Sequence, residues 1–189
     1  MKNLSLSLLS IIFIVSCSEN DPYSARVLNA DTENESWLLH GRTYDESRFS
    51  PLNDINDSNV QDLGLAWSFE TGTNRGHETT PIVVDGIMFI TAPWSVVFAL
   101  DAKTGKELWS FDPEADKDWA RNACCDVVNR GVAVWGDQVV FATIDGRLIS
   151  LDKASGVVNW DVLTIDKSKP YTITGAPRII DGKIIIGNG

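Results

Sequence analysis

A motif that recurs at an offset of 51 residues limits the architectures open to this chain more than any other feature. The stretch ALDAKTGKELW, residues 99–109, aligns with SLDKASGVVNW, residues 150–160, so that an Asp, a Gly and a Trp each recur at that offset of 51. A weaker match, Leu65-Ala-Trp67-Ser-Phe69, predicts a leading outer strand. Repetition at periods of roughly 20–50 residues is typical of folds built from one repeated supersecondary unit. The chain is therefore expected to consist of such units.

Each full repeat is preceded by the pattern of a short β-hairpin. Asp-Gly or Gly-Asp pairs stand between β-branched runs in residues 82–90, 132–141 and 178–186. These pairs favour tight turns because Gly and Asp tolerate the positive φ that such turns need. Residues 96–100 and 147–151 are further predicted strands. Together with the segments that end at each Trp, they give about four short strands in a repeat.

Four short strands in a period of about 40–50 residues are typical of a β-propeller blade. The Asp-x-x-Thr/Ser-Gly turn is expected to join the two outer strands, and the Trp to dock between neighbouring blades. A β-sandwich with coincidental Trp spacing is the alternative, which the matched hairpins disfavour. We predict an all-β protein, a β-propeller with tryptophan-docking blades, represented here by about two and a half blades. Because closure takes about four to eight blades, we expect the N-terminal part of a longer protein.

The first 17 residues have the pattern of an export signal. Lys2 precedes an apolar run over residues 4–15, which ends at Cys17 and not at an A-x-A site. This end resembles the lipobox of bacterial lipoproteins, in which the cysteine is lipidated; an ordinary signal peptide with an incidental cysteine is the alternative. We expect an exported, periplasmic lipoprotein, and Ser18 suits sorting to the outer membrane. Residues 18–36 are polar and aperiodic and are predicted to be a flexible tether, which leaves 37–189 for the propeller domain.

Composition and missing motifs exclude several classes of function. The net charge of −10 and the lack of a Lys/Arg cluster argue against a nucleic-acid surface. The sequence holds no apolar run of the roughly 18–20 residues that a bilayer span needs. A C-x-x-C-H haem motif, a Gly-rich phosphate loop and a G-x-S-x-G elbow are also missing. His40 and His77 lack partners at metal-ligand spacing, and we expect them to be structural or solvent-facing.

Two adjacent cysteines, Cys124 and Cys125, remain once Cys17 is assigned to lipid. An oxidising periplasm permits a disulfide. Neighbouring Cα atoms are about 3.8 Å apart, closer than the roughly 4.4–6.8 Å of ordinary disulfides. A bridge between neighbours would therefore close a stiff eight-membered ring. Since it would staple no long loop, its use would be a rigid local surface against which a ligand can pack.

Four segments together resemble one enzyme family, the pyrroloquinoline quinone (PQQ)-dependent alcohol dehydrogenases. They are the opening WLLHGRTYDESRFSP at 37–51, RGHETTP at 75–81, CCDVVNRG at 124–131 and TITGAP at 172–177. The resemblance covers residues 37–189 and is nearest to the quinohaemoprotein type, in which a cytochrome c domain with haem c follows the propeller. It implies an eight-bladed propeller that holds PQQ and Ca²⁺ near its central axis. In some relatives a lanthanide replaces the calcium.

The resemblance also implies which residues contact the cofactor. Cys124 and Cys125 would form a vicinal disulfide packed on one face of the quinone. Arg130 would pair with a PQQ carboxylate, because a planar guanidinium matches an oxyanion through two hydrogen bonds. Glu78 and Thr174 would hydrogen-bond around its polar edge. The implied cofactor-binding residues are Glu78, Cys124, Cys125, Arg130, Thr174 and Gly189.

Each of these residues taken singly has a structural alternative. Arg130 could be a surface residue paired with Asp126, Glu78 could cap a turn, and Thr174 could belong to a strand. The family places its catalytic base and its calcium ligands beyond residue 189. We therefore predict no catalytic and no metal-binding residue within this chain.

The activity that the resemblance implies is oxidation of alcohols to aldehydes. Ca²⁺ would polarise the quinone C5 carbonyl, a carboxylate would take the alcohol proton, and hydride would pass to C5. The electrons would then pass singly to a cytochrome c. Two alternatives stay open: a non-enzymatic propeller lipoprotein that serves as an outer-membrane assembly scaffold, and a PQQ-dependent sugar dehydrogenase.

Overall fold

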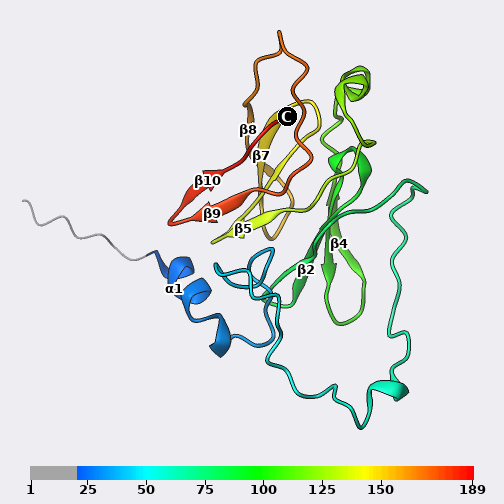
Figure 1. Cartoon of the computed structure of the whole chain (residues 1–189), viewed down its shortest axis with the longest axis vertical. Coiled ribbons are helices and arrows are strands. Elements are labelled where there is room, and N and C mark those ends of the chain that lie inside the picture. The colour runs from blue at the N-terminus through cyan, green and yellow to red at the C-terminus, as the bar shows by residue number, and fades with distance from the viewer. Residues whose placement is uncertain (1–20) are drawn as a thin grey trace, which may run out of the picture.

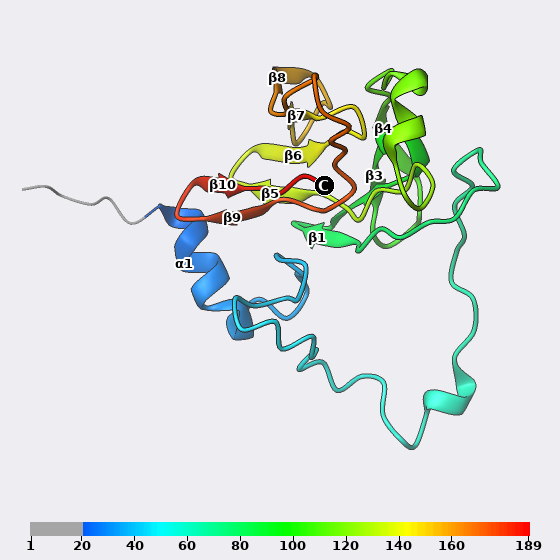
Figure 2. The same ribbon diagram turned by 45° about the horizontal axis from the view of Figure 1, so that its top comes forward.

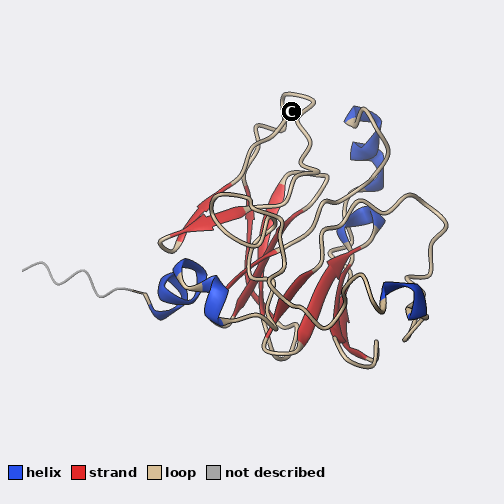
Figure 3. Ribbon diagram, turned by 60° about the horizontal axis from the view of Figure 1, so that its bottom comes forward, coloured by secondary structure: helices blue, strands red, loops and turns tan. Residues whose placement is uncertain are grey.

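The computed structural model describes residues 21–189, so the predicted signal peptide, Cys17 and the start of the predicted tether lie outside the described residues. Strands form the body of the described part, and short helices lie around it (Figures 1 and 3). The helices are the α-helix α1 and four 3₁₀ turns, with the bounds α1 Pro22–Leu28, η1 Ala30–Thr32, η2 Val60–Asp62, η3 Pro93–Ser95 and η4 Lys117–Asn122. No helix of the described residues is long and apolar enough to cross a membrane.

The first sheet has four antiparallel strands in the order β1-β2-β3-β4. Their bounds are β1 Ile82–Val84, β2 Ile87–Thr91, β3 Val97–Asp101 and β4 Glu107–Phe111. Asp85 and Gly86 join β1 to β2 with φ of 54° and 78°, as a type I′ turn requires. Residues 97–100 of β3 are all buried, because both faces of this strand are covered.

The second sheet repeats this arrangement with strands in the order β5-β6-β7-β8. Their bounds are β5 Ala133–Trp135, β6 Gln138–Ala142, β7 Arg147–Asp152 and β8 Val158–Leu163. The β3–β4 register shifts between Ala99 and Leu100, and the β7–β8 register shifts between Ser150 and Leu151. These positions are equivalent in the sequence repeat, so the offset of 51 residues extends to the strand pairing.

A third sheet contains the hairpin of β9 (Arg178–Ile180) and β10 (Lys183–Ile185). Its turn residues Asp181 and Gly182 have φ of 51° and 69°, so the turn geometry of β1–β2 recurs. Two four-stranded sheets and one hairpin confirm all three predicted hairpins and the all-β class (Figure 2).

The repeated tryptophans dock on the turns of the following sheet. The Trp109 ring covers Gly156, where an added Cβ would lie 2.8 Å from the ring, and its Nε1 donates to the carbonyl of Lys153 at 3.1 Å. Trp67 covers the equivalent Gly105 in the same way, since a Cβ there would overlap its ring. Trp67 and Trp109 therefore each pack on the glycine of an outer turn in the following sheet, as the spacing predicted.

The predicted leading strand at residues 65–69 is wrong as an element. Trp67 and Phe69 pack over β3, with the Phe69 ring 5.1 Å from that of Phe98, but the segment has no strand assignment. A strand needs a neighbour for ladder hydrogen bonds, and among residues 21–189 none pairs with this segment. Its aromatic side chains still cover the outer face of the first sheet.

The flexible tether predicted for residues 18–36 is also wrong over its described part. Pro22–Leu28 form α1, which Asp21 caps by accepting a hydrogen bond from the Tyr23 amide at 2.8 Å. Tyr23 and Val27 are buried in the main core, and the Tyr23 ring lies 5.0 Å from the ring of Trp135. Two apolar side chains one helical turn apart thus dock a short polar segment on the sheets.

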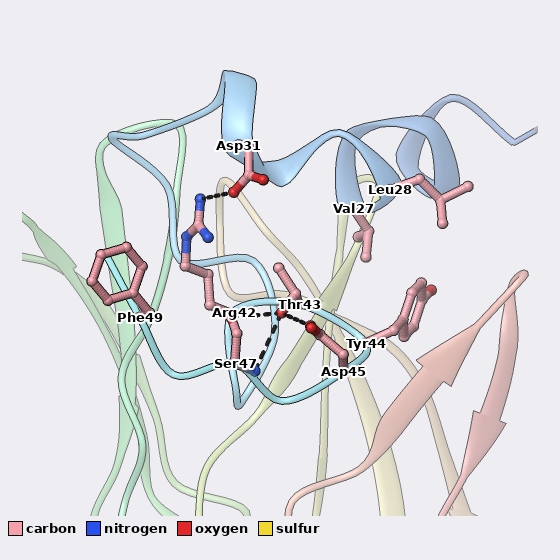
Figure 4. Close-up of a pocket in the computed structure, with 9 residues that line it drawn as sticks. All are labelled: Val27, Leu28, Asp31, Arg42, Thr43, Tyr44, Asp45, Ser47 and Phe49. Carbon is pink, nitrogen blue, oxygen red and sulfur yellow. Dashed lines mark hydrogen bonds and ion pairs between the residues drawn. The ribbon is translucent and has the colours of Figure 1, made fainter. Parts of the chain in front are cut away.

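A buried arginine holds the end of this N-terminal segment. Arg42 is 3% exposed and donates to the carbonyl of Ala30 at 3.0 Å, while its guanidinium pairs with Asp31 at 2.9 Å. A groove of about 400 Å³ separates α1 and η1 from the loop at residues 42–49 (Figure 4). The groove is lined by residues of both segments and is not the place where the predicted cofactor residues meet.

Candidate functional site

Three chain segments meet where strands β1, β5 and β9 begin. Glu78, Arg130 and Thr174 each stand a few residues before one of these strands. The Arg130 guanidinium pairs with the Glu78 carboxylate at 2.8 Å and donates to the Thr174 hydroxyl at 2.5 Å. The site therefore lies where the first strand of each of the three sheets begins, and Arg130 is at its centre.

Backbone hydrogen bonds fix the same three segments. The amide of Thr80 donates to the carbonyl of Arg130 at 3.1 Å, and the amide of Arg130 donates to the carbonyl of Thr174 at 2.9 Å. Gly131 has a φ of 123°, and a Cβ there would lie 3.0 Å from the carbonyl of Thr80. Only glycine permits this close approach without strain. The Arg130 side chain is thus aimed by a clamped backbone.

The buried side chain of Asn129 fixes the backbone of residues 129–131 through three hydrogen bonds. Its amide nitrogen donates to the Ser95 hydroxyl at 3.0 Å and to the carbonyl of Ala142 at 2.8 Å, and its side-chain oxygen accepts from the amide of Gly131 at 2.9 Å. Residue 129 is 1% exposed. The sequence did not indicate this role, because a polar residue in a loop gives no local sign of burial.

Cys124 and Cys125 form the expected vicinal disulfide, and their Cα atoms are 3.8 Å apart. Both residues are exposed. The next residue, Asp126, pairs with Arg75, whose guanidinium carbon lies 5.7 Å from the centre of the Trp94 ring. The loop that carries Glu78 therefore holds the cysteine segment as well, through Arg75.

Arg130, Glu78 and Thr174 do not have the particular structural roles that the sequence left open for them. Arg130 pairs with Glu78 and not with Asp126, which is taken by Arg75. Glu78 does not cap a turn, since its carboxylate faces the guanidinium. Thr174 lies outside the strands.

The other end of the site is formed by a short backbone pairing. The amide of Gly189 donates to the carbonyl of Thr172 at 3.1 Å, and the amide of Thr172 donates back to the carbonyl of Gly189 at 2.7 Å. Thr172 is two residues from Thr174, so Gly189 borders the cluster. Direct side-chain contacts join Glu78, Arg130 and Thr174, whereas Gly189 borders them through Thr172.

The two histidines differ in their surroundings. His40 is only partly exposed, and its Nε2 lies 2.9 Å from the Thr80 hydroxyl, so it supports the loop that Arg130 contacts. Burial lowers the pKa of His40, and the nearby Arg178 adds to this effect while Glu46 opposes it. His77 is exposed, and its Nε2 lies 2.7 Å from the Thr71 hydroxyl. Within residues 21–189 no group of three His, Cys, Asp or Glu side chains could hold a metal ion.

These groups suit a flat, anionic ligand with polar edges. The side chains of Arg130 and Glu78 are 43% and 41% exposed, so both can be reached from solvent. A guanidinium binds a carboxylate, a hydroxyl can donate or accept, and a carboxylate accepts from a ring N–H. The exposed disulfide offers polarizable sulfur surface. PQQ, a tricyclic quinone with carboxylates and a pyrrole N–H, fits this set of donors and acceptors.

Residues 37–189 match the β-propeller domain described as "Glucose/ethanol/alcohol dehydrogenase", a PQQ domain. The chain belongs to the PQQ-dependent dehydrogenase family. This confirms the resemblance and the propeller class, so the two four-stranded sheets are blades. The match begins at Trp37 and includes every residue of the site just described.

Curated relatives of the chain support the same family. The quinohemoprotein alcohol dehydrogenase ADH IIB of Pseudomonas putida is 57% identical over 153 residues, which are 81% of this chain and 22% of the relative. The 1-butanol dehydrogenase (cytochrome c) of Thauera butanivorans is 54% identical over 154 residues, 81% of this chain and 22% of the relative. The chain thus spans less than a quarter of the length of these curated relatives.

Solved structures show the same similarity in three dimensions. The quinohemoprotein alcohol dehydrogenase ADHIIG from Pseudomonas putida HK5 superposes with a TM-score of 0.85 at 53% identity, over 87% of this chain and 24% of that one. A europium-containing methanol dehydrogenase superposes with a TM-score of 0.82 at 37% identity, over 87% of this chain and 29% of that one.

Proposed function

We propose that this chain supplies one wall of the cofactor site of a PQQ- and calcium-dependent dehydrogenase, which oxidises alcohols to aldehydes and passes electrons to a cytochrome c. The observation that carries the proposal is the meeting of Glu78, Arg130 and Thr174 in one hydrogen-bonded cluster. The names of the relatives, which are alcohol dehydrogenases, support the substrate class.

The residues of this chain would bind and orient the cofactor. Arg130 would hold a PQQ carboxylate, because its guanidinium keeps free donors besides those used on Glu78 and Thr174. Glu78 and Thr174 would face the polar edge, and the Cys124–Cys125 disulfide would support one face of the ring. When bound, PQQ supplies the acceptor for the hydride of the alcohol. This assignment places no proton-transfer step on residues 21–189.

The cofactor site can be tested by titration of PQQ in the presence of Ca²⁺ into the protein expressed from its natural coding sequence. We expect saturable binding, followed by alcohol-dependent reduction of a redox dye with ethanol and 1-butanol. Glucose serves as the comparison substrate, since a preference for glucose would favour the sugar dehydrogenase. Absence of both PQQ binding and dye reduction would favour the scaffold and overturn the proposal.

A double variant tests the role of the disulfide. Cys124→Ser/Cys125→Ser removes the bridge but leaves two small polar side chains on an exposed loop. We expect PQQ binding and dye reduction to fall while the unfolding midpoint changes little, since the bridge closes no long loop. Unchanged PQQ affinity in the double variant would remove the disulfide from the site.

We also propose that the protein is exported and carries lipid at Cys17, which anchors it on the periplasmic side of the outer membrane. The support is the lipobox-like end of the apolar run at residues 4–15. Mass spectrometry of the N-terminal peptide from a membrane fraction tests this. Recovery of an unmodified Cys17 within a longer N-terminal peptide would contradict it.

A further inference from the structure

The N-terminal helix docks at the end of the molecule where the hairpins turn. Arg26 pairs with Asp85 of the β1–β2 turn at 2.9 Å, and Trp135 at the β5–β6 turn donates from its Nε1 to the Asp21 carboxylate at 2.5 Å. The β9–β10 turn lies beside them, since a Cβ on Gly182 would be 3.9 Å from that same Nε1. Helix α1 therefore lies at the turn end of the first hairpin in each of the three sheets.

The candidate cofactor site lies at the opposite end of the same strands. Glu78, Arg130 and Thr174 precede β1, β5 and β9, and these strands run from the site toward the turns. The six residue steps from Arg130 to Gly136 span at most about 20 Å in extended backbone. In Figures 1 and 2 the C-terminal residue and α1 lie at opposite ends of the β9–β10 hairpin.

The docking of α1 shortens the connection to the lipidation site. A free tether over residues 18–36 could extend to about 65 Å at roughly 3.4 Å per residue. In the structure the ordered helix begins after Asp21, its N-cap residue, so only Ser18, Glu19 and Asn20 separate it from Cys17. Four residue steps reach no farther than about 14 Å. A lipid on Cys17 would therefore join the chain within about 14 Å of Asp21, which lies at the turn end of the blades.

We propose that the lipidated N-terminus seats the turn end of the blades on a phospholipid bilayer and turns the rim with Arg130 and the disulfide away from it. The inference rests on the proposed lipidation of Cys17. It commits to a lipid surface as the partner of this end, and it leaves the cofactor rim open to substrate and to an electron acceptor from the aqueous side.

The charge of the turn end indicates that the acyl chains supply the attachment. Asp31, Asp137 and Asp181 have side chains that are 85%, 93% and 72% exposed there. Carboxylates gain nothing from anionic headgroups, whereas two or more acyl chains anchor a protein stably. Binding to phosphatidylcholine vesicles should therefore be at least as strong as binding to phosphatidylglycerol vesicles.

The orientation can be measured with the lipidated protein in vesicles that contain a nitroxide-labelled lipid. A fluorophore is attached through Asp137→Cys at the β5–β6 turn or, as the matched control, through Ser168→Cys in an exposed loop near the site end. We expect emission from position 137 to be quenched and emission from position 168 to stay unquenched. Equal quenching at both positions, or stronger quenching at 168, would overturn the proposal.

A second variant separates anchoring from orientation. Ten Gly/Ser residues inserted between Asn20 and Asp21 lengthen the connection by an r.m.s. span of about 17 Å without touching the fold. This variant should bind vesicles as the parent does but lose the difference between positions 137 and 168. A difference that survives the insertion would show that α1 docking does not set the orientation.

The test is independent of the enzyme activity. Alcohol-dependent dye reduction is measured on the same vesicles, so a protein that is oriented but inactive would reject only the dehydrogenase. Cys17→Ser should abolish vesicle binding. Persistent binding of this variant, or an unmodified Cys17 in the parent, would overturn the orientation inference and leave the cofactor site untouched.

Discussion

Arg130 is the side chain on which the candidate site depends, because it contacts both Glu78 and Thr174. Arg130→Lys keeps the charge but loses the planar fork, and a charged hydrogen bond contributes about 1.5–3 kcal/mol. We expect PQQ to bind about 10- to 100-fold more weakly. Fluorescence titration of PQQ measures this, with Arg121→Lys on the exposed end of η4 as the control. An unchanged Kd for the Arg130 variant would contradict the proposed role.

Gly156 tests the tryptophan docking at the same scale. Its φ is 71°, and a Cβ would lie 2.8 Å from the Trp109 ring. Gly86 has a similar φ of 78° with no heavy atom within 4 Å, so Gly86→Ala carries only the backbone strain. Gly156→Ala should be less stable than Gly86→Ala by about 1–3 kcal/mol, the usual cost of overpacking. Urea unfolding of both variants gives the difference, and equal midpoints would mean that the ring moves aside freely.

Sequence information was most complete for residues whose role is local. Asp101 and Asp152 accept from the Thr104 and Ser155 amides, each at 2.8 Å, so the repeated turn closes within five residues and the motif alone predicts it. The burial of Asn129 depends on Ser95 and Ala142, which come from other segments. No local pattern encodes such a partner. The family resemblance, and not the spacing, singled out Glu78 and Arg130.

At the scale of elements, α1 is held partly by ion pairs that acid should weaken. Hydrogen bonds from Arg26 lower the pKa of Glu33 and the pKa of Asp85. The Glu33 and Asp85 carboxylates therefore bind protons more readily when Arg26 is released than when α1 is docked. The stabilisation is present above about pH 4.5 and is lost as the pH falls through the lower pKa values of the docked state. The protection factors of the Tyr23–Val27 amides, which correct the exchange rates for the intrinsic effect of pH, should therefore fall in acid.

Arg26→Gln should reproduce this loosening at neutral pH. Exchange in α1 is expected to rise while that of β6 stays slow, because β6 lies in the buried core. Lys183→Gln breaks an exposed ion pair with Asp181 and serves as the control. If the acid-dependent step persists unchanged in Arg26→Gln, the ion pairs do not hold the helix.

Elements with a partner close in sequence were predicted correctly, and the two that fail lack one. The hairpins pair strands across two-residue turns, so their pattern is complete in about nine residues. Helix α1 has only Tyr23 and Val27 as buried residues. Two apolar positions are too few to show a helical period in a polar segment. Residues 65–69 have the side chains of a strand, but strand assignment also needs a neighbouring backbone.

At the scale of the whole molecule, exposed apolar side chains should make residues 21–189 self-associate when they are expressed alone. Leu52, Ile55, Leu63 and Leu65 in the loop before the first sheet are 50–85% exposed, and Val162 and Leu163 on β8 are 52% and 50% exposed. Exposed apolar groups favour association, because each buried Å² contributes about 25 cal/mol. Residues 21–189 expressed alone should bind the dye ANS and associate with rising concentration, as sedimentation velocity would show. Leu63→Ser/Leu65→Ser should reduce both effects, whereas Leu108→Ser, which removes one exposed apolar side chain from β4, should change them less. A monomeric segment without ANS binding would mean that the loop folds back over its own apolar side chains.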